Sequence, residues 1–141
     1  MAVNPEKNIF SIIDANVNRA KEGLRVIEDV VRFIYKNKKF LGKIKNIRHK
    51  IDNVTYDMGT SYKTLLYNRN SLSDTGRKIK NKGEFKREKF TDILVSNFKR
   101  TEESLRVLEE VSKILNKKCA MEFKDLRYRV YELEKQIVLN A

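Results

Sequence analysis

Three polar residues recur at one spacing in two parts of the chain. An amide is followed three residues later by a guanidinium and three later again by a carboxylate, and the whole pattern returns after 81 residues. Guanidinium groups bind phosphate or carboxylate in planar, bidentate geometry. The residues of the two sets are Asn16, Arg19 and Glu22, and then Asn97, Arg100 and Glu103.

The first set lies partly on the face that should be buried. At 100° per residue, Asn16 falls inside the apolar stripe of its helix, and Arg19 and Glu22 lie progressively beyond the stripe's edge. An uncompensated buried Asn costs about 1–3 kcal/mol, and a buried charge costs more. Polar residues on the apolar face occur in both copies. We therefore expect either a ligand site or a buried polar layer in which the two sets pair with each other.

Arginine is retained at matched positions although Lys is the commoner cation in this chain. This preference favours bidentate recognition of an anion. Arg25 is the exception, because it points away from the predicted core beside Glu22, Glu28 and Asp29, so surface ion pairs are its expected role unless another subunit packs there. The matched pairs are Arg19/Arg100, Arg25/Arg106 and Arg48/Arg127.

A central segment, residues 68–86, lacks apolar periodicity and is rich in turn-forming residues. A loop of this length is either a functional lid or disordered. Its Asp74-Thr75-Gly76 sequence is a candidate site for an anion or Mg²⁺. By contrast, residues 57–60 (Asp-Met-Gly-Thr) are predicted to be helical, because Met58 continues an apolar stripe. The lone His49 aligns with Tyr128 of the second copy, which argues against a catalytic or metal-binding role.

The elements that would position these residues are helices. Residues 15–34 and 96–115 share 8 identical positions of 20, and in both copies apolar residues step by three and four. A weaker repeat relates residues 44–51 to 123–130. We therefore predict an all-α bundle of four long helices, built from a duplicated helix hairpin. The expected single domain, 1–141, comprises a first pair (1–67), the central loop (68–86) and a second pair (87–141).

Composition limits the function classes. The 141 residues are 40% hydrophobic and 35% charged, with a net charge of +12 and a single cysteine, Cys119. These values favour one folded domain without disulfides, and no apolar run reaches the about 18 residues of a membrane helix. We expect a cytoplasmic protein with no membrane partner. The positive charge predicts an anionic partner: nucleic acid, acidic lipid or a phosphorylated small molecule.

Several motifs together resemble a known family. Residues 14–29 are similar to its "DANxNRAxEGLRVxED" element, and Arg48-His49 to its "RH". The family is that of the monofunctional hydroxymethylpyrimidine phosphate kinases of thiamine biosynthesis, often fused N-terminally to thiamine phosphate synthase. Further matches are Arg69 with Asp74-Thr75-Gly76 ("R…DxG"), Glu84 with Arg87 ("ExxR"), residues 97–110 ("NxKRxxESLRVLEE") and residues 126–135 ("LRYxxYxLEK"). Asn70 departs from the family's usual "RD". The end at Ala141, near where a synthase would begin, favours the stand-alone form.

The resemblance implies a kinase that transfers the γ-phosphate of ATP to 4-amino-2-methyl-5-hydroxymethylpyrimidine phosphate, with Mg²⁺ as cofactor. One Asn/Arg/Glu set would then hold the pyrimidine phosphate and the other ATP, across one cleft. Nucleic acid is not an expected partner; a homo-oligomer is possible. Two alternatives stay open: a basic nucleic-acid-binding module and a non-catalytic regulatory bundle. The implied catalytic residues are Arg19, Arg100 and Asp74; the implied binding residues are Asn16, Glu22, Arg48, Arg69, Gly76, Asn97, Glu103 and Arg127; the implied Mg²⁺ ligands are Glu22, Glu103 and Asp74.

Overall fold

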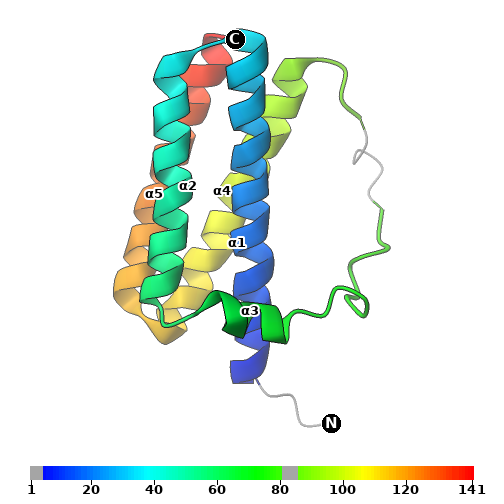
Figure 1. The fold of residues 1–141 in the computed structure, drawn as a ribbon, viewed down its shortest axis with the longest axis vertical. Coiled ribbons are helices and arrows are strands. Elements are labelled where there is room, and N and C mark those ends of the chain that lie inside the picture. The colour runs from blue at the N-terminus through cyan, green and yellow to red at the C-terminus, as the bar shows by residue number, and fades with distance from the viewer. Residues whose placement is uncertain (1–4, 81–85) are drawn as a thin grey trace.

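The protein is a bundle of long helices with one irregular segment outside it (Figure 1). The computed structural model describes the backbone of residues 5–80 and 86–141. No strand occurs among these residues, so the predicted all-α class is confirmed. The elements are α1 (Pro5–Asp29), its π-helical continuation η1 (Val30–Tyr35), α2 (Lys38–Asp57), α3 (Tyr62–Asn68), α4 (Phe90–Leu115) and α5 (Lys117–Leu139).

The four long helices form two layers. Helix α4 packs along both α1 and α5, and α2 closes the bundle against α5 and α1. The predicted apolar stripes supply the core, with Ile13, Leu24, Leu105 and Phe123 fully buried. Short links join the members of each pair, and both use an asparagine cap: Asn37 Oδ1 accepts from the Lys39 amide, and Asn116 Oδ1 accepts from the Lys118 and Cys119 amides.

A pseudo-twofold axis relates the two helix pairs and passes between α1 and α4. Ala20 and Thr101, which are equivalent under the 81-residue repeat, meet there, and Thr101 Oγ1 donates to the Ala20 carbonyl at 3.2 Å. The helices approach closely because Gly23 lacks a side chain: a Cβ there would overlap Thr101 Oγ1 and lie 3.0 Å from the Asn97 carbonyl. Helices α1 and α4 therefore run antiparallel, and matching positions of the repeat occupy matching places on the bundle.

The prediction that residues 57–60 are helical is wrong. Helix α2 ends at Asp57, and Gly59 adopts a left-handed conformation with φ of 81°, which glycine tolerates at no steric cost. A separate short helix, α3, then begins after Ser61, whose Oγ accepts from the Thr64 amide. The described residues consequently form five α-helices where four were expected. Helix α3 lies across α1 and brings the start of the central loop to it (Figure 1).

The irregular segment is longer at its C-terminal end than predicted, because α4 begins only at Phe90. Asp92 Oδ2 accepts from the backbone amides of Glu88 and Lys89, which fixes the start of that helix. Residues 71–80 are all exposed. Within the described part of the chain, no helix has the length and apolarity that crossing a membrane requires.

Candidate functional site

A polar cavity of about 1010 Å³ lies between the first half of α1 and the start of the central loop. Its size falls within the range of small-molecule sites. The cavity receives five of the residues that the sequence singled out: Asn16, Arg19, Glu22, Arg69 and Asp74. From the second repeat, Val107 of α4 completes the wall.

The loop is fixed to α1 by an ion pair. Arg69 Nε donates to Asp14 Oδ2 at 2.7 Å, and Arg69 Nη2 donates to Asp14 Oδ1 at 2.8 Å. Asp14 is only 6% exposed, and its hydrogen bonds hold the pKa of Arg69 above its usual range. Ser11 Oγ also donates to the Asn68 carbonyl at 3.0 Å. These contacts hold the first loop residues against the cavity, while Nη1 of Arg69 takes part in neither bond to Asp14.

Asp14 is a site residue that the sequence analysis did not select. Its partner is 55 residues away, so no local spacing reveals the pair. The available signal was the difference between the repeats: the position that matches Asp14 in the second copy is Val95. A carboxylate that has no counterpart in an otherwise similar copy indicates a role specific to the first half.

The two asparagines are satisfied within their own helices. Asn16 Nδ2 donates to the Ile12 carbonyl at 2.9 Å, and Asn97 Nδ2 donates to the Ile93 carbonyl at 2.8 Å. The amide groups therefore do not pair with each other across the bundle. In Asn16 this bond directs the amide nitrogen along the helix, which leaves the side-chain oxygen as an acceptor at the cavity.

The Asp74-Thr75-Gly76 sequence forms a turn at the cavity edge. Asp74 Oδ1 accepts from the Gly76 amide at 2.8 Å, so one carboxylate oxygen orders the loop. Asp74 and Thr75 line the cavity, whereas Gly76 lies outside its lining. Glu84, the acidic residue of the "ExxR" motif, lies outside the described residues.

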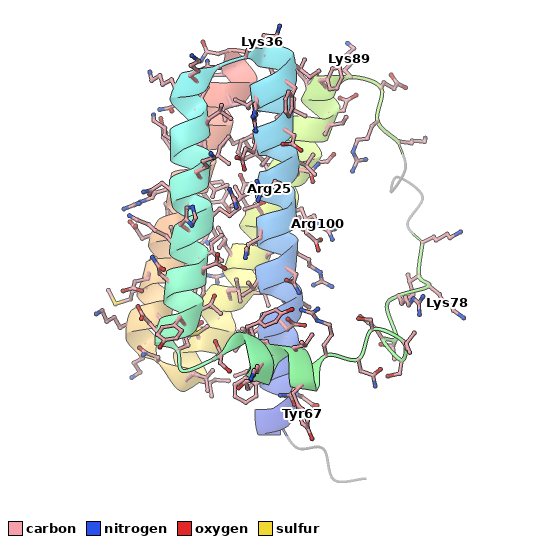
Figure 2. The ribbon with its side chains drawn as sticks, in the orientation of Figure 1. Arg25, Lys36, Tyr67, Lys78, Lys89 and Arg100 are labelled. Carbon is pink, nitrogen blue, oxygen red and sulfur yellow. The ribbon has the colours of Figure 1, made fainter. Side chains whose placement is uncertain are left out.

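The second Asn/Arg/Glu set lies beside this cavity and does not line it. Arg100 approaches Glu22 of the first set, with Nη2 3.9 Å from Oε2, and both side chains are exposed. Figure 2 shows Arg100 on the side of the bundle that the loop faces. Glu103 is exposed and Asn97 is half-buried. The two Asn/Arg/Glu sets thus lie on the same side of the bundle, and the cavity is lined by the first set only.

Arg48 and Arg127 lie elsewhere, in two matching ion-pair clusters. Arg48 Nη2 is 3.3 Å from Glu28 Oε2, and Arg127 Nη2 is 3.3 Å from Glu109 Oε2. Both glutamates are buried and each also pairs with an arginine of its own helix, Arg25 or Arg106. Nε of Arg48 and Nε of Arg127 are buried without a hydrogen-bond partner. Here the retained arginines bind carboxylates of the protein itself.

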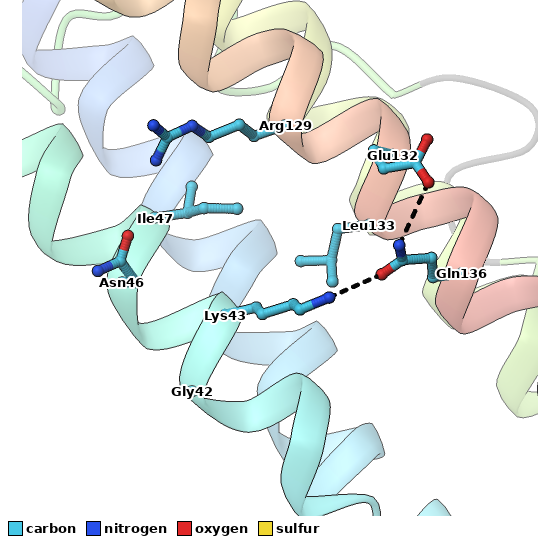
Figure 3. Close-up of a pocket in the computed structure, with 8 residues that line it drawn as sticks. All are labelled: Gly42, Lys43, Asn46, Ile47, Arg129, Glu132, Leu133 and Gln136. Carbon is cyan, nitrogen blue, oxygen red and sulfur yellow. Dashed lines mark hydrogen bonds between the residues drawn. The ribbon is translucent and has the colours of Figure 1, made fainter.

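A separate, smaller pocket lies between α2 and α5 (Figure 3). It measures about 360 Å³ and has Ile47 and Leu133 at its base. A hydrogen bond from Lys43 to Gln136 crosses it, and Gln136 in turn donates to Glu132 of the same helix. A hollow of about 540 Å³ farther along the same helices is lined by the pseudo-twofold equivalents of these residues. Neither contains a residue that the sequence analysis selected.

The cavity residues fit a Mg²⁺ ion that binds together with a phosphate ligand. They fit a permanently bound Mg²⁺ ion less well. No cluster of three or more His, Cys, Asp or Glu occurs among the described residues. Glu22 and Asp74 nevertheless place two carboxylates at the cavity, where Asp14 is already neutralised by Arg69. Mg²⁺ commonly binds through one or two carboxylates plus substrate phosphates, and retains several waters. Glu103, the third implied ligand, does not line the cavity.

Fold and site together define an all-helical protein with a duplicated helix pair and a ligand-sized polar cavity on one of its two copies. The chain belongs to the ThiD2 family, whose model matches residues 11–136. This match covers the whole central loop, all of the cavity lining except Asn8, and the helices except the start of α1 and the end of α5. No solved structure matches the chain.

The chain is also similar to longer curated proteins. A thiamine-phosphate synthase of Prochlorococcus marinus is 39% identical over 131 residues, which cover 93% of this chain and 36% of that protein. Thiamine-phosphate synthases of Nostoc sp. and Gloeobacter violaceus are each 35% identical, over 92% and 95% of this chain and 35% and 38% of their own lengths. The chain therefore spans somewhat more than a third of the curated relatives it matches.

Proposed function

We propose that this chain acts in thiamine biosynthesis as an ATP-dependent kinase that converts 4-amino-2-methyl-5-hydroxymethylpyrimidine phosphate to the diphosphate. Membership of the ThiD2 family and the relatives named thiamine-phosphate synthase support the pathway. The observation that carries the reaction is the cavity, which gathers asparagine amides, two guanidinium groups and three carboxylates, one of them paired with Arg69, around a volume suited to small phosphorylated ligands.

Phosphoryl transfer requires charge neutralisation and alignment more than covalent chemistry. In the proposed reaction, a phosphate oxygen of the pyrimidine substrate attacks the γ-phosphorus of ATP. The bond from that phosphorus to the β–γ bridging oxygen breaks, and ADP leaves. The attacking oxygen is already ionised, so the reaction needs no general base. This agrees with a cavity lining that contains no histidine.

Each cavity residue then has a separate task. Arg19 and Nη1 of Arg69 bind phosphate oxygens, and the side-chain oxygen of Asn16 accepts from the amino group of the pyrimidine. Glu22 and Asp74 would hold Mg²⁺, which would neutralise phosphate charge. Without Mg²⁺, these two carboxylates outweigh Arg19 and would repel a polyphosphate. The proposed ligands are therefore small phosphorylated molecules that bind together with Mg²⁺.

The direct test is ADP release from ATP and Mg²⁺ in the presence of the pyrimidine phosphate, with the diphosphate identified by mass spectrometry. Arg19→Lys keeps the charge but loses the bidentate geometry, so kcat/KM should fall at least tenfold, about 1.4 kcal/mol of transition-state stabilisation. Arg25→Lys is the matched control, because Arg25 lies on the same helix outside the cavity and should retain activity.

Two results would defeat this proposal. One is a wild-type protein that releases no more ADP with the pyrimidine phosphate than without it. The other is an Arg19→Lys variant with wild-type kinetics, which would remove Arg19 from phosphate binding. Circular dichroism of both variants separates loss of activity from loss of the helical fold.

A further inference from the structure

Apolar side chains recur every seven residues along the outer surface of α1 and η1, and again along α4. In both helices an arginine takes the second position of the series. Phe33 is 60% exposed and its repeat equivalent, Ile114, is 79% exposed. We call this surface the α1/α4 face; its residues are Ile12, Arg19, Val26 and Phe33, with their equivalents Ile93, Arg100, Val107 and Ile114.

The two series form one continuous surface. Val107 of α4 lines the same cavity as Ile12 and Arg19 of α1. Near the pseudo-twofold axis, Arg100 of α4 reaches Glu22 of α1. Because α1 and α4 are antiparallel neighbours, side chains that flank their contact on the outer side must share a face.

The described loop residues meet this face only at one end, where they line the cavity together with Ile12, Arg19 and Val107. Beyond that end, Figure 1 shows the described parts of the segment between α3 and α4 lying away from the bundle, on the side of α1 and α4. Each residue from 71 to 80 is exposed, including Leu72 and Ile79. Exposed apolar side chains that repeat along two neighbouring helices are characteristic of a protein interface.

The charges of this face favour a second copy of the chain as the occupant. The protein carries a net charge of +12, so two copies repel each other over most of their surfaces. On the α1/α4 face and its immediate edge, however, Arg19 and Arg100 are balanced by Glu22 and Glu103. A polyanion would find no net attraction here, whereas Arg100 of one copy, which lies outside the cavity lining, can meet Glu103 of the other.

The face is also large enough for a stable dimer. Helices of 25 and 26 residues (α1 and α4) are each about 38 Å long at about 1.5 Å per residue. Two such helices packed side by side, about 9 Å apart, present a surface roughly 20 Å wide. The product is about 750 Å² on each copy, close to the about 800 Å² per partner of a typical stable interface.

We propose that two copies of this chain associate through their α1/α4 faces. The interface is isologous, since each copy contributes the same residues. It places the apolar positions of one copy against those of the other, and it brings the partner next to the cavity that opens at one end of the face. The proposal does not depend on the proposed reaction, because molecular mass alone reports it.

The test is the solution mass of the 16.7 kDa chain, measured by light scattering during size-exclusion chromatography at several concentrations. The wild-type protein should have twice the monomer mass. Val26→Glu with Val107→Glu adds two acidic groups to each face and should yield monomers. Should circular dichroism show that this variant is unfolded, Phe33→Glu with Ile114→Glu makes the same test at far more exposed positions.

The matched control is Met121→Glu with Leu139→Glu, which makes the same chemical change at two exposed positions of α5. Met121 lines the larger α2/α5 hollow, so the control also tests the rival face. It should remain dimeric. A monomeric wild type would overturn the proposal. So would a dimer that survives both α1/α4 variants, or one that only the α5 variant disrupts.

Discussion

Glu102 provides the clearest test of how the bundle responds to pH. Its side chain is 3% exposed, and Lys99 Nζ lies 3.2 Å from its Oε1 and 3.1 Å from Oε1 of Glu134. The second carboxylate oxygens of Glu102 and Glu134 are buried without a partner. Burial first, and then the charge of Glu134, raise the pKa of Glu102 to about 7, against the opposing effect of Lys99.

The sign of the effect follows from linkage. In the unfolded chain the carboxyl titrates near 4.5, so between about pH 4.5 and about pH 7 the folded state binds a proton that the unfolded state has lost. The resulting stabilisation is complete below pH 4.5 and is lost as the pH rises through 7. At about 1.4 kcal/mol for each pH unit, the effect amounts to at most about 3.5 kcal/mol.

Glu102→Gln removes the titrating group and keeps the side-chain shape. At pH 8 the variant should be more stable than wild type by about 1–3 kcal/mol, because wild type then buries a carboxylate charge. At pH 4, below the pKa of both the folded and the unfolded state, the two proteins should be nearly equal. The measurement is urea unfolding followed by circular dichroism at both pH values, and the control is Glu103→Gln, an exposed neighbour. An equal difference at the two pH values, or no gain at pH 8, would refute the reasoning.

Three further predictions concern the site and the helix contact. Asp14→Asn, which weakens the pair with Arg69, should raise KM more than it lowers kcat in the ADP-release assay; Asp29→Asn, an exposed change on the same helix, is the control. Gly23→Ala should destabilise the fold by about 1–3 kcal/mol in urea unfolding, because the new methyl group overlaps Thr101 Oγ1; a stability equal to wild type would show that the helices can separate. Removing Mg²⁺ with a chelator should weaken ATP binding at least tenfold by calorimetry, and unchanged affinity would exclude the carboxylates from metal-assisted binding.

Much of the fold could be predicted because its signals are local. Apolar residues at steps of three and four identify the long helices, and the 81-residue repeat predicts that equivalent positions such as Ala20 and Thr101 occupy equivalent places. The turn after α2 was missed because Met58 continues the apolar stripe while the next residue, Gly59, adopts a positive φ. The apolar pattern was given more weight than Gly59, whose positive φ ends the helical conformation there.

The site was harder to predict because its contacts join distant parts of the chain. The arginines at positions 48 and 127 were expected to bind phosphate, but each pairs through Nη2 with a buried glutamate, Glu28 or Glu109, and sequence alone does not reveal these partners. The clustering of Asn16, Arg19 and Glu22 with the loop depends on Asp14, whose partner is supplied only by the tertiary fold. The roles assigned to these residues in binding stay predictions.

The contact between Ala20 and Thr101 also suggests how such a chain could have arisen. A single helix pair of about 70 residues would expose its apolar stripes, and two identical copies could bury them by meeting at this same point. Joining the copies in tandem frees each half to change independently. Asp14 and Val95 occupy equivalent positions of the repeat, as do Lys21 and Glu102, yet the residues of each pair differ. In an assembly of two identical copies, any such substitution would have appeared in both copies at once.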